Sequence, residues 1–377
     1  MSAAAIRASL RRCRRIVVKI GSRALSRDAS TSTGGRRRKT IFDRLAADLQ
    51  RAATTPPPPR GKERGVVLVS SGAIALGLEP LGLERRPRAM PTLQAAAAAG
   101  QSRLMERWAA GFSRQGRAVA QVLLSHADLA SRARANNARD AVLKLLELGV
   151  VPIINENDAV AVDEIRFGDN DALAAMVTPL CEGDLLILLS DVEGVLDDDG
   201  ARVPFAPRVD DAVLSLVRKG QTEVGSGGMA SKLEAARRAT LAGAHVVIAG
   251  ADDAGAVPRI LAGRDVGTLF PGVTRRLKSR KHWIAYTLRP TGAAVLDDGA
   301  VAAVLEHKRS ALCVGVVGVR GRFVPGDAIT LVDRAGREIA RGLTRLSAAD
   351  AARMAGHGAD SVVLVHRDDL VVLPSVP

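Results

Sequence analysis

The strongest constraint on the fold comes from six short apolar runs, rich in β-branched residues, that alternate with Ala/Leu-rich stretches. Strands that are apolar at nearly every position are buried on both faces, as in a parallel sheet covered by helices. This alternation predicts an α/β fold, a parallel-sheet α/β/α sandwich. The runs occupy residues 15–20, 65–71, 118–124, 150–155, 184–190 and 244–250, and the expected helices occupy 41–53, 89–115, 134–148, 169–180 and 229–242.

The character of the sequence changes near residue 275. Residues 275–284 are basic and lack helical periodicity, which predicts a linker. Short alternating strands separated by glycine turns follow, and they are typical of a small β-rich domain or partly closed barrel. We therefore expect one domain over residues 1–274 and a second over residues 285–377.

The chain has 377 residues and a formal net charge of +14. The basic runs 11–15, 36–39 and 275–281 leave binding to nucleic acid open. Aromatic residues make up only 2% of the chain, too few for a base-stacking platform. Three scattered cysteines without metal-ligand spacing fit a cytoplasmic location, and no apolar run reaches membrane-spanning length.

Polar and small residues follow several of the expected strands. Lys19 lies near the end of the first run, just before Gly21, and Ser71 ends the second. Asn155 and Asp191 lie at the ends of two later runs. Because the carboxyl ends of parallel strands meet at one edge of a sheet, we expect these side chains to lie close together. Glycine turns and a lysine at such an edge favour binding of an anion.

The segment VGSGGMASK, residues 224–232, is a glycine loop. Gly225, Gly227 and Ala230 match a dinucleotide-binding pattern, but no strand immediately precedes them. Lys232 is not followed by Ser or Thr, as the lysine of a P-loop would be. What remains is a glycine loop that enters a helix with a lysine in its first turn, which favours phosphate binding over a bare loop.

The acidic stretch NENDAVAVDEIRFGDND, residues 155–171, contains six carboxylates. Two explanations are open: a solvated acidic loop, or a pocket that holds a cation within an otherwise anion-binding site. The six histidines show no metal-ligand spacing, and no Ser/His/Asp order typical of nucleophilic catalysis is apparent. Two lysines and glycine turns without a base or nucleophile indicate phosphoryl transfer, which depends mostly on positioning and charge neutralisation.

The blocks VVKIGS, VSSGAI, INENDAVAVDEIRFGDND and GSGGMASK, in this order, resemble the glutamate 5-kinases of the amino acid kinase family over nearly the whole chain. The blocks DDGAVAAVL, GRFVPGDAI and GREIARGL resemble the PUA domain that many of these enzymes carry. The resemblance implies an amino acid kinase catalytic domain followed by a PUA-like domain. It implies transfer of a phosphoryl group from ATP to the side-chain carboxylate of L-glutamate, which gives L-glutamyl 5-phosphate in the first step of proline biosynthesis.

The resemblance also implies roles for individual residues. It places Lys19 and Lys232 on the phosphates in the transition state, and it makes Asp171 the residue that holds both ammonium groups. The substrate-binding positions that it matches are Ser71, Asp158 and Asn170. The nucleotide-binding positions that it matches are Lys19, Ser190, Asp191, Ser226, Gly227, Gly228, Met229, Ala230, Ser231 and Lys232. It implies no metal-ligating residue, with Mg²⁺ held mainly through the phosphates of ATP.

General chemistry agrees with these roles. A glutamate side chain has a pKa near ~4.3 and is ionised at neutral pH, so the nucleophile needs no general base. Asp158, beside the amides of Asn155 and Asn170, can bind the α-ammonium group of glutamate, which would explain the acidic stretch and makes Asn155 a fourth predicted substrate-binding residue. The resemblance further implies feedback inhibition by proline and a homo-oligomer, and it leaves RNA binding by the C-terminal domain open.

Two alternatives remain at this point. One is another amino-acid or carbamate kinase of the same family, and the other is an RNA-binding protein that acts through the C-terminal domain. Three features depart from the resemblance: Arg23 stands where Ser or Thr is frequent, prolines 56–59 lengthen a loop, and ALCVGV replaces a Leu-Pro-rich strand start.

Overall fold

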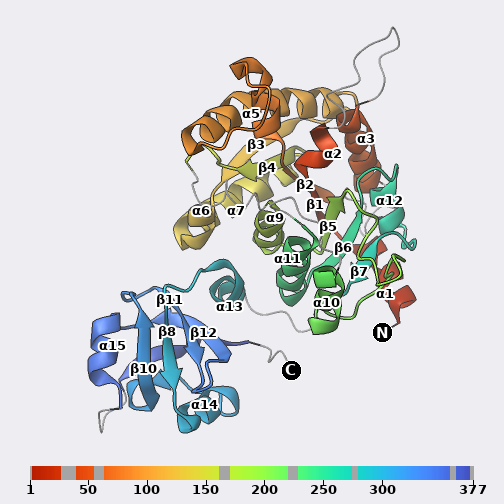
Figure 1. The fold of residues 1–377 in the computed structure, drawn as a ribbon. Helices are drawn as coiled ribbons and strands as arrows, with labels where there is room; N and C mark the ends of the chain where they lie inside the picture. The colour runs from red at the N-terminus through yellow and green to blue at the C-terminus, as the bar shows by residue number, and fades with distance from the viewer. Residues whose placement is uncertain are drawn as a thin grey trace. The chain divides into compact units, whose positions relative to one another are not determined.

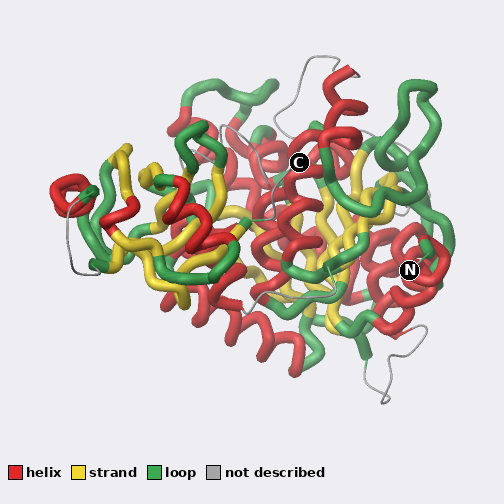
Figure 2. The backbone as a smooth tube through the Cα atoms, turned by 90° about the horizontal axis from the view of Figure 1, so that it is seen from below, coloured by secondary structure: helices red, strands yellow, loops and turns green. Residues whose placement is uncertain are grey.

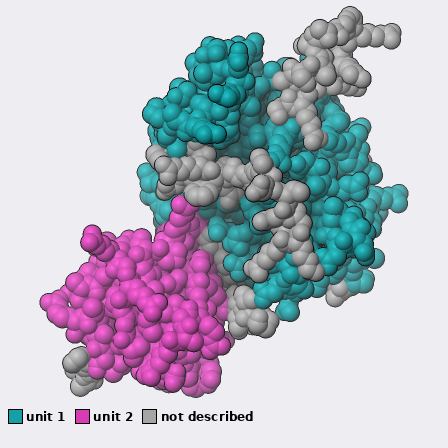
Figure 3. All heavy atoms as spheres, viewed as in Figure 1, with its two compact units in different colours: residues 1–275 teal, residues 276–377 magenta. Residues whose placement is uncertain are grey.

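The structure is a computed structural model that describes residues 2–26, 40–54, 63–160, 170–219, 228–273, 279–356 and 362–373. The chain divides into two compact units, residues 1–275 and 276–377, which Figure 3 shows in different colours. Each unit has its own β-sheet and its own hydrophobic core. A separate core is the property that allows part of a chain to fold independently.

A seven-stranded sheet in the order β3-β4-β2-β1-β5-β6-β7 lies at the centre of the first unit (Figure 1). Every neighbouring pair is parallel except β6–β7. The strands are β1 (Arg15–Ile20), β2 (Gly65–Ser70), β3 (Val119–Leu124), β4 (Val151–Glu156), β5 (Leu185–Ser190), β6 (His245–Gly250) and β7 (Thr268–Phe270). The six apolar runs thus form the parallel strands, whereas the short edge strand β7 was not predicted.

Helices cover both faces of this sheet, as Figure 2 shows from below. Successive side chains of a strand point to opposite faces, so Ile16, Val18 and Ile20 of β1 join one core cluster and Val17 joins the other. Helices α3, α5 and α12 contribute to the first cluster, and α7, α9 and α11 contribute to the second. The predicted α/β/α sandwich is therefore confirmed.

The helices of the first unit follow the sequence expectations closely for the long segments. They are α1 (Ala3–Ser9), α2 (Ser22–Ser26), α3 (Ile41–Thr54), α4 (Ala73–Gly77), α5 (Met90–Ser113), α6 (His126–Ala130), α7 (Arg132–Glu147), α9 (Asn170–Leu180), α10 (Asp211–Lys219), α11 (Met229–Leu241) and α12 (Ala256–Leu261), with short 3₁₀ turns at Leu10–Arg12 and Glu79–Leu81. The short helices α1, α2, α4, α6 and α12 escaped prediction because five to seven residues show little helical period, and the nine-residue helix α10 was not predicted either.

The short helix α4 packs closely on α5 through two glycines. A Cβ atom added to Gly77 would lie 1.8 Å from the carbonyl oxygen of Ala96, and one added to Gly100 would lie 1.8 Å from that of Ala73. Only glycine at both positions lets the two backbones touch. Because α4 begins just after β2, this contact fixes the segment that leaves the carboxyl edge of the sheet at β2.

The second unit contains a six-stranded sheet in the order β10-β8-β11-β12-β13-β9, whose neighbours are antiparallel except for β11–β8. Its core includes Leu331, Leu364 and Val365, all fully buried. The strands are β8 (Gly292–Leu296), β9 (Ala311–Leu312), β10 (Val316–Gly321), β11 (Ala328–Val332), β12 (Glu338–Thr344) and β13 (Val363–Val372). The helices are α13 (Ser279–His282), a π-helical turn (Trp283–Thr287), α14 (Asp298–Leu305), a 3₁₀ turn (Cys313–Gly315) and α15 (Ala348–Met354).

Part of the expected linker is helical. Residues 279–284 lie in α13 and the π-helical turn, and Ile284 is fully buried. The Arg341 guanidinium donates a hydrogen bond to the carbonyl oxygen of Ala285 at 2.8 Å, which ties this turn to β12. Residues 274–278 lie outside the described residues, and the exact domain boundaries stay a prediction.

The contact between α4 and α5 leads to a test of stability. Gly→Ala within an exposed helix normally stabilises by up to ~1 kcal/mol through helix propensity. We expect the opposite for Gly100→Ala, because the new methyl group meets the backbone of α4. Thermal unfolding should show a Tm lowered by several degrees. Ala98→Gly, on the exposed side of α5, is the control that changes helix propensity without touching α4. If Ala98→Gly lowers Tm more than Gly100→Ala does, the contact between α4 and α5 contributes less to stability than we expect.

Candidate active site

The carboxyl ends of β1, β2, β4 and β5 lie together at one edge of the sheet, because these strands are parallel neighbours in the order β4-β2-β1-β5. Lys19 lies near the end of β1, Ser71 directly follows β2, Asn155 lies near the end of β4, and Asp191 directly follows β5. Ligands of open α/β sheets bind at this edge. The edge therefore carries the candidate site.

A buried group of three charges forms the centre of the site. Lys19 Nζ lies 2.6 Å from Asp171 Oδ1, and Lys232 Nζ lies 3.3 Å from Asp171 Oδ2. The hydroxyl group of Ser231 donates a hydrogen bond to Asp171 Oδ2 at 3.0 Å. All three charged side chains are at most 7% exposed. The group keeps one net positive charge in a buried position, which favours an anionic ligand beside it.

Burial and the two ammonium groups act in opposite directions on Asp171. Burial by itself would raise the pKa of this carboxyl group, because desolvation disfavours the charged form. The charges of Lys19 and Lys232, together with hydrogen bonds from Lys19 and Ser231, outweigh burial and lower the pKa. Asp171 is therefore ionised at neutral pH and holds both lysines by charge.

Secondary structure explains how residues so far apart in sequence meet. Lys19 comes from β1, Asp171 is the second residue of α9, and Lys232 is the fourth residue of α11. Helices α9 and α11 pack against each other, and α9 also contacts β1. The first turns of both helices therefore face the carboxyl edge of the sheet, where their exposed N–H groups add to the positive potential.

A pocket of about 210 Å³ opens beside this charge group. Its walls come from the turns after β1 and β2, from the end of β4 and from the start of α9. The lining residues are Ser22, Arg23, Ser71, Gly72, Ala73, Ile74, Ala75, Leu78, Arg86, Asn155, Glu156, Asp158 and Asn170. It thus brings together all four residues predicted to bind substrate, and its size suits a small polar molecule.

Amide side chains connect the floor of this pocket. Asn170 Nδ2 donates to Ser71 Oγ at 2.6 Å and to Asn155 Oδ1 at 3.1 Å. Asn155 Nδ2 donates in turn to Gln101 Oε1 at 2.9 Å. Within the described part of the chain, Asn170 Oδ1 is buried and has no hydrogen-bond partner. A buried acceptor of this kind is available to a donor group of a ligand.

Gln101 and Trp108 of α5 support the pocket, and sequence reasoning missed both. Besides the bond of Gln101 to Asn155, the indole N–H of Trp108 donates to Ser70 Oγ at 2.9 Å, and Ser70 Oγ donates to the carbonyl oxygen of Ser71 at 3.1 Å. Trp108 and Ser70 are fully buried. No local motif marks these residues, because their partners lie 38 and 54 positions away in the sequence.

The other side of the edge carries the residues that sequence reasoning assigned to a nucleotide. Ser190 Oγ donates to Asp191 Oδ1 at 3.0 Å, and the Arg23 guanidinium lies 3.2 Å from Asp191 Oδ2. Partial burial alone would raise the pKa of Asp191, but hydrogen bonds from Ser190 and Arg23 outweigh this effect and lower it. Arg23 thus forms an ion pair at the position where the sequence departs from its resemblance.

The glycine loop is described only in part. Ser226 and Gly227 lie outside the described residues. Gly228 is the N-cap residue of α11, and Met229, Ala230 and Ser231 form the turn that carries Lys232 to Asp171. The predicted helix that begins after the glycine loop is present, with its lysine in the first turn.

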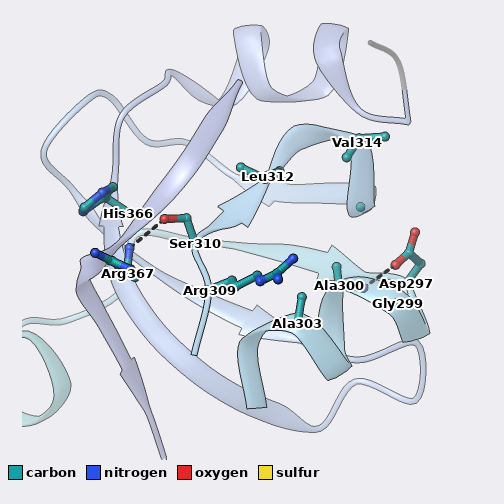
Figure 4. Close-up of a pocket in the computed structure, with 11 residues that line it drawn as sticks. Asp297, Gly299, Ala300, Ala303, Arg309, Ser310, Leu312, Val314, His366 and Arg367 are labelled. Atoms are coloured by element: carbon teal, nitrogen blue, oxygen red, sulfur yellow. Dashed lines mark hydrogen bonds between the residues drawn. The ribbon is translucent and has the colours of Figure 1, made fainter. Parts of the chain in front are cut away.

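A larger cavity, of about 580 Å³, lies in the second unit (Figure 4). Gly299, Ala300 and Ala303 of α14 form one wall, and Arg309 extends along it. Another wall comes from β13, where the backbone N–H of Arg367 donates to Ser310 Oγ at 3.0 Å. Much of the lining is apolar, and it lacks the buried lysine and carboxylate group of the first unit. Size alone therefore does not make this cavity the catalytic centre.

No group of three or more His, Cys, Asp or Glu side chains in the described ranges could hold a metal ion. Asp171, the most buried carboxylate of the site, is already engaged by two ammonium groups. This donor set suits anionic oxygens rather than a bare cation.

Comparison with known proteins adds independent evidence. The amino acid kinase family profile matches residues 14–250, and the PUA domain profile matches residues 292–365. The chain therefore belongs to the amino acid kinase family, and its second unit is the predicted PUA-like domain.

Several curated relatives named glutamate 5-kinase align with almost the whole chain. The relative from Streptomyces coelicolor is 45% identical over 98% of this chain and 99% of its own length. The relative from Myxococcus xanthus is also 45% identical, over 97% of this chain and 98% of its own length. One from Frankia casuarinae is 46% identical over 96% of this chain and 97% of its own. A solved carbamate kinase from Giardia lamblia, bound to AMP-PNP, covers 69% of this chain and 99% of its own at 16% identity, with a TM-score of 0.48 that is too low to support an argument.

The buried charge group predicts a pH-dependent loss of stability in Asp171→Asn. Removal of one partner of a buried ion pair costs about 3–5 kcal/mol, because the remaining charges stay uncompensated. The pKa of Asp171 is lower in the folded chain than in the unfolded chain, where it is about 3.9. The contribution of the Asp171 carboxylate to the free energy of unfolding is therefore complete above the unfolded-state pKa and is lost as the pH falls through the folded-state pKa. The difference in Tm between the natural chain and the variant should be large at pH 5 to 7 and should shrink below about pH 4.

Asp158→Asn is the matched control for this experiment, since it makes the same substitution in the same acidic stretch. Asp158 is half-buried at the rim of the pocket. Its substitution should change Tm little at any pH. Equal effects of the two variants would show that the charge group does not stabilise the fold.

Proposed function

We propose that this chain transfers the γ-phosphoryl group of ATP to the side-chain carboxylate of L-glutamate, the activity that its curated relatives are named for. The observation that supports this most directly is the Lys19–Asp171–Lys232 group beside a small polar pocket that carries a half-buried acid. The product is L-glutamyl 5-phosphate, which begins proline biosynthesis. Another amino-acid or carbamate kinase is not favoured, because the relatives at about 45% identity share the one name.

The reaction makes modest demands on acid–base chemistry. The acceptor carboxylate is ionised at neutral pH and attacks the γ-phosphorus without a general base. A new bond forms between a carboxylate oxygen and phosphorus, the bond from phosphorus to the β–γ bridging oxygen breaks, and ADP leaves with the electron pair. The main obstacle is the accumulation of negative charge on the oxygens around phosphorus.

Lys19 and Lys232 are suited to neutralise that charge, and we assign both to the transferring phosphoryl group. Their ammonium groups lie 2.6 Å and 3.3 Å from the two carboxylate oxygens of Asp171, so both are held in place before the substrates arrive. A fixed, buried cation stabilises a transition state well because it needs no reorganisation during the reaction. Asp171 is the positioning residue, since it holds the lysines together and limits their mutual repulsion.

The pocket accounts for recognition of glutamate. Asp158 supplies a negative charge for the α-ammonium group, and the unpartnered Oδ1 of Asn170 can accept one of its hydrogen bonds. Asn155 and Ser71 hold Asn170 in place through their own hydrogen bonds. A ligand with a cationic group at one end and a carboxylate near the lysines fits this distribution of charge.

The nucleotide is assigned to the side of the edge that carries Ser190, Asp191 and the start of α11, including residues 226–232. Phosphates bound there face the N-terminus of a helix of 13 residues and the ammonium group of Lys232. Mg²⁺ would be held mainly through the ATP phosphates, where it supplies further neutralisation of charge. The residues of this chain contribute the lysines and the backbone N–H groups.

Feedback inhibition by proline, assembly into a homo-oligomer and a cytoplasmic location are further parts of the proposal. They rest on the resemblance to glutamate 5-kinases rather than on the geometry of the site. No helix in the described ranges is long and apolar enough to cross a membrane.

ADP release with and without glutamate tests the proposal, with aspartate and N-acetylglutamate as competing acceptors. N-acetylglutamate lacks the cationic group that Asp158 would bind, so it should be a poor substrate. Glutamate-independent ADP release, or a preference for the acetylated acceptor, would contradict the assignment.

Asp158→Asn and Asp171→Asn should affect the two kinetic constants differently. Loss of the charge-assisted contact to the α-ammonium group should raise the KM for glutamate by roughly 30-fold while the KM for ATP changes little. Loss of the charge that positions both lysines should instead lower kcat by about 10²-fold or more. Steady-state kinetics on both variants measure this. A similar, mild effect of both would mean that residues 155–171 form only a solvated acidic segment.

Deletion of residues 285–377 should leave measurable glutamate-dependent ADP release. All assigned site residues precede residue 233, and the deleted part has its own core. Circular dichroism of the shortened chain should confirm that the first unit is folded before activity is measured. A folded first unit without any activity would show that the second unit completes the active site.

A further inference from the structure

Arg23 lies between the pocket assigned to glutamate and the side of the site assigned to the nucleotide. It is the second residue of α2, just after the turn that follows β1, and it lines the same pocket as Asp158 and Asn170. Its guanidinium group also pairs with Asp191, on the side assigned to the nucleotide. The side chain therefore reaches from the acceptor pocket toward the donor side.

The strand pairing explains this placement. β1 and β5 are parallel neighbours, with Ile20 opposite Leu189, so the residues that follow them emerge side by side at the carboxyl edge. A γ-phosphoryl group must cross this boundary to reach an acceptor in the pocket. Arg23 and Arg86 are the two cationic side chains among the residues that line the pocket in the described part of the chain, and only Arg23 is paired with a residue on the donor side.

Arg23 differs from the two lysines in solvent exposure and in its partner. Its side chain is 60% exposed, whereas Lys19 and Lys232 are each 7% exposed. An exposed ion pair such as Arg23–Asp191 contributes little to stability and is easily exchanged. Asp191 would keep the hydrogen bond from Ser190 if Arg23 moved away. A guanidinium group can bind two phosphate oxygens at once, and the γ-phosphate of ATP carries more negative charge than the single carboxylate of Asp191.

Building on the proposed function, we propose that Arg23 is a further catalytic residue, which leaves Asp191 and binds the γ-phosphate of ATP as this group is transferred. The positive charge of Arg23 adds to the single net charge of the Lys19–Asp171–Lys232 group while the oxygen–phosphorus bond to ADP breaks and the bond to the acceptor carboxylate forms. The two lysines are fixed before substrates bind, and Arg23 joins them only when ATP is present.

Nucleotide affinity tests this inference without relying on turnover. Isothermal titration of the full chain with AMP-PNP and with ADP, each with Mg²⁺, isolates the contribution of the γ-phosphate. Arg23→Gln should weaken binding of AMP-PNP by about 10-fold or more and leave binding of ADP nearly unchanged, because one charge-assisted contact is lost. Arg86→Gln removes the other pocket arginine and should leave the ratio of the two affinities as it is in the natural chain.

Kinetics provide the second test. Arg23→Gln should lower kcat by about 10²-fold with little change in the KM for glutamate, and Arg23→Lys should retain an intermediate rate because charge remains without the planar fork. An unchanged AMP-PNP to ADP affinity ratio in Arg23→Gln, or equal losses in kcat for Arg23→Gln and Arg23→Lys, would overturn the inference. A natural chain that binds AMP-PNP but shows no glutamate-dependent turnover would instead contradict the proposed function.

Discussion

The contact of Asp171 with Lys19 and Lys232 is the interaction on which the rest of the site depends. The three side chains come from β1, α9 and α11, and each is almost completely buried. A lone charge in such a position would be strongly unfavourable, so each element needs the other two to be in place. The same group keeps an excess positive charge at the carboxyl edge of the sheet, where negative charge accumulates in phosphoryl transfer. Stability and the proposed chemistry thus rest on one set of contacts.

Packing away from the charges determines the shape of the pocket proposed for the acceptor. Gly77 and Gly100 let α4 and α5 approach until their backbones touch, and the segment that carries Ser71 lies directly before α4. Trp108 and Gln101, both on α5, then hold Ser70 and Asn155 by hydrogen bonds. One long helix therefore supports two sides of the pocket without lining it. Changes in α5 are expected to act on substrate affinity through these contacts rather than through direct contact with the substrate.

The same topology separates the pocket proposed for the acceptor from the side proposed for the donor nucleotide. Residues after β2 and near the end of β4 face the pocket, whereas residues at the end of β5 and at the start of α11 face the side assigned to the nucleotide. β1 lies between them, which explains why Lys19 and the following turn belong to both sides. Arg23 lies on that turn, and the proposal for this residue follows from its position at the boundary.

Periodicity and composition determined much of the fold from the sequence alone. The six apolar runs became the parallel strands, and all of them except the partly exposed edge strand β3 are largely buried, which requires apolar side chains at nearly every position. Parallel strands also bring their carboxyl ends to one edge, so the proximity of Ser71 and Asn155 could be inferred without coordinates. The motifs were enough to indicate the family, which the comparisons support. Only the tertiary structure decided the partners of Gln101, Trp108 and Arg23. Their hydrogen bonds and ion pairs join residues separated by 38 to 168 positions, and such contacts depend on how helices pack, which no local pattern of residues records.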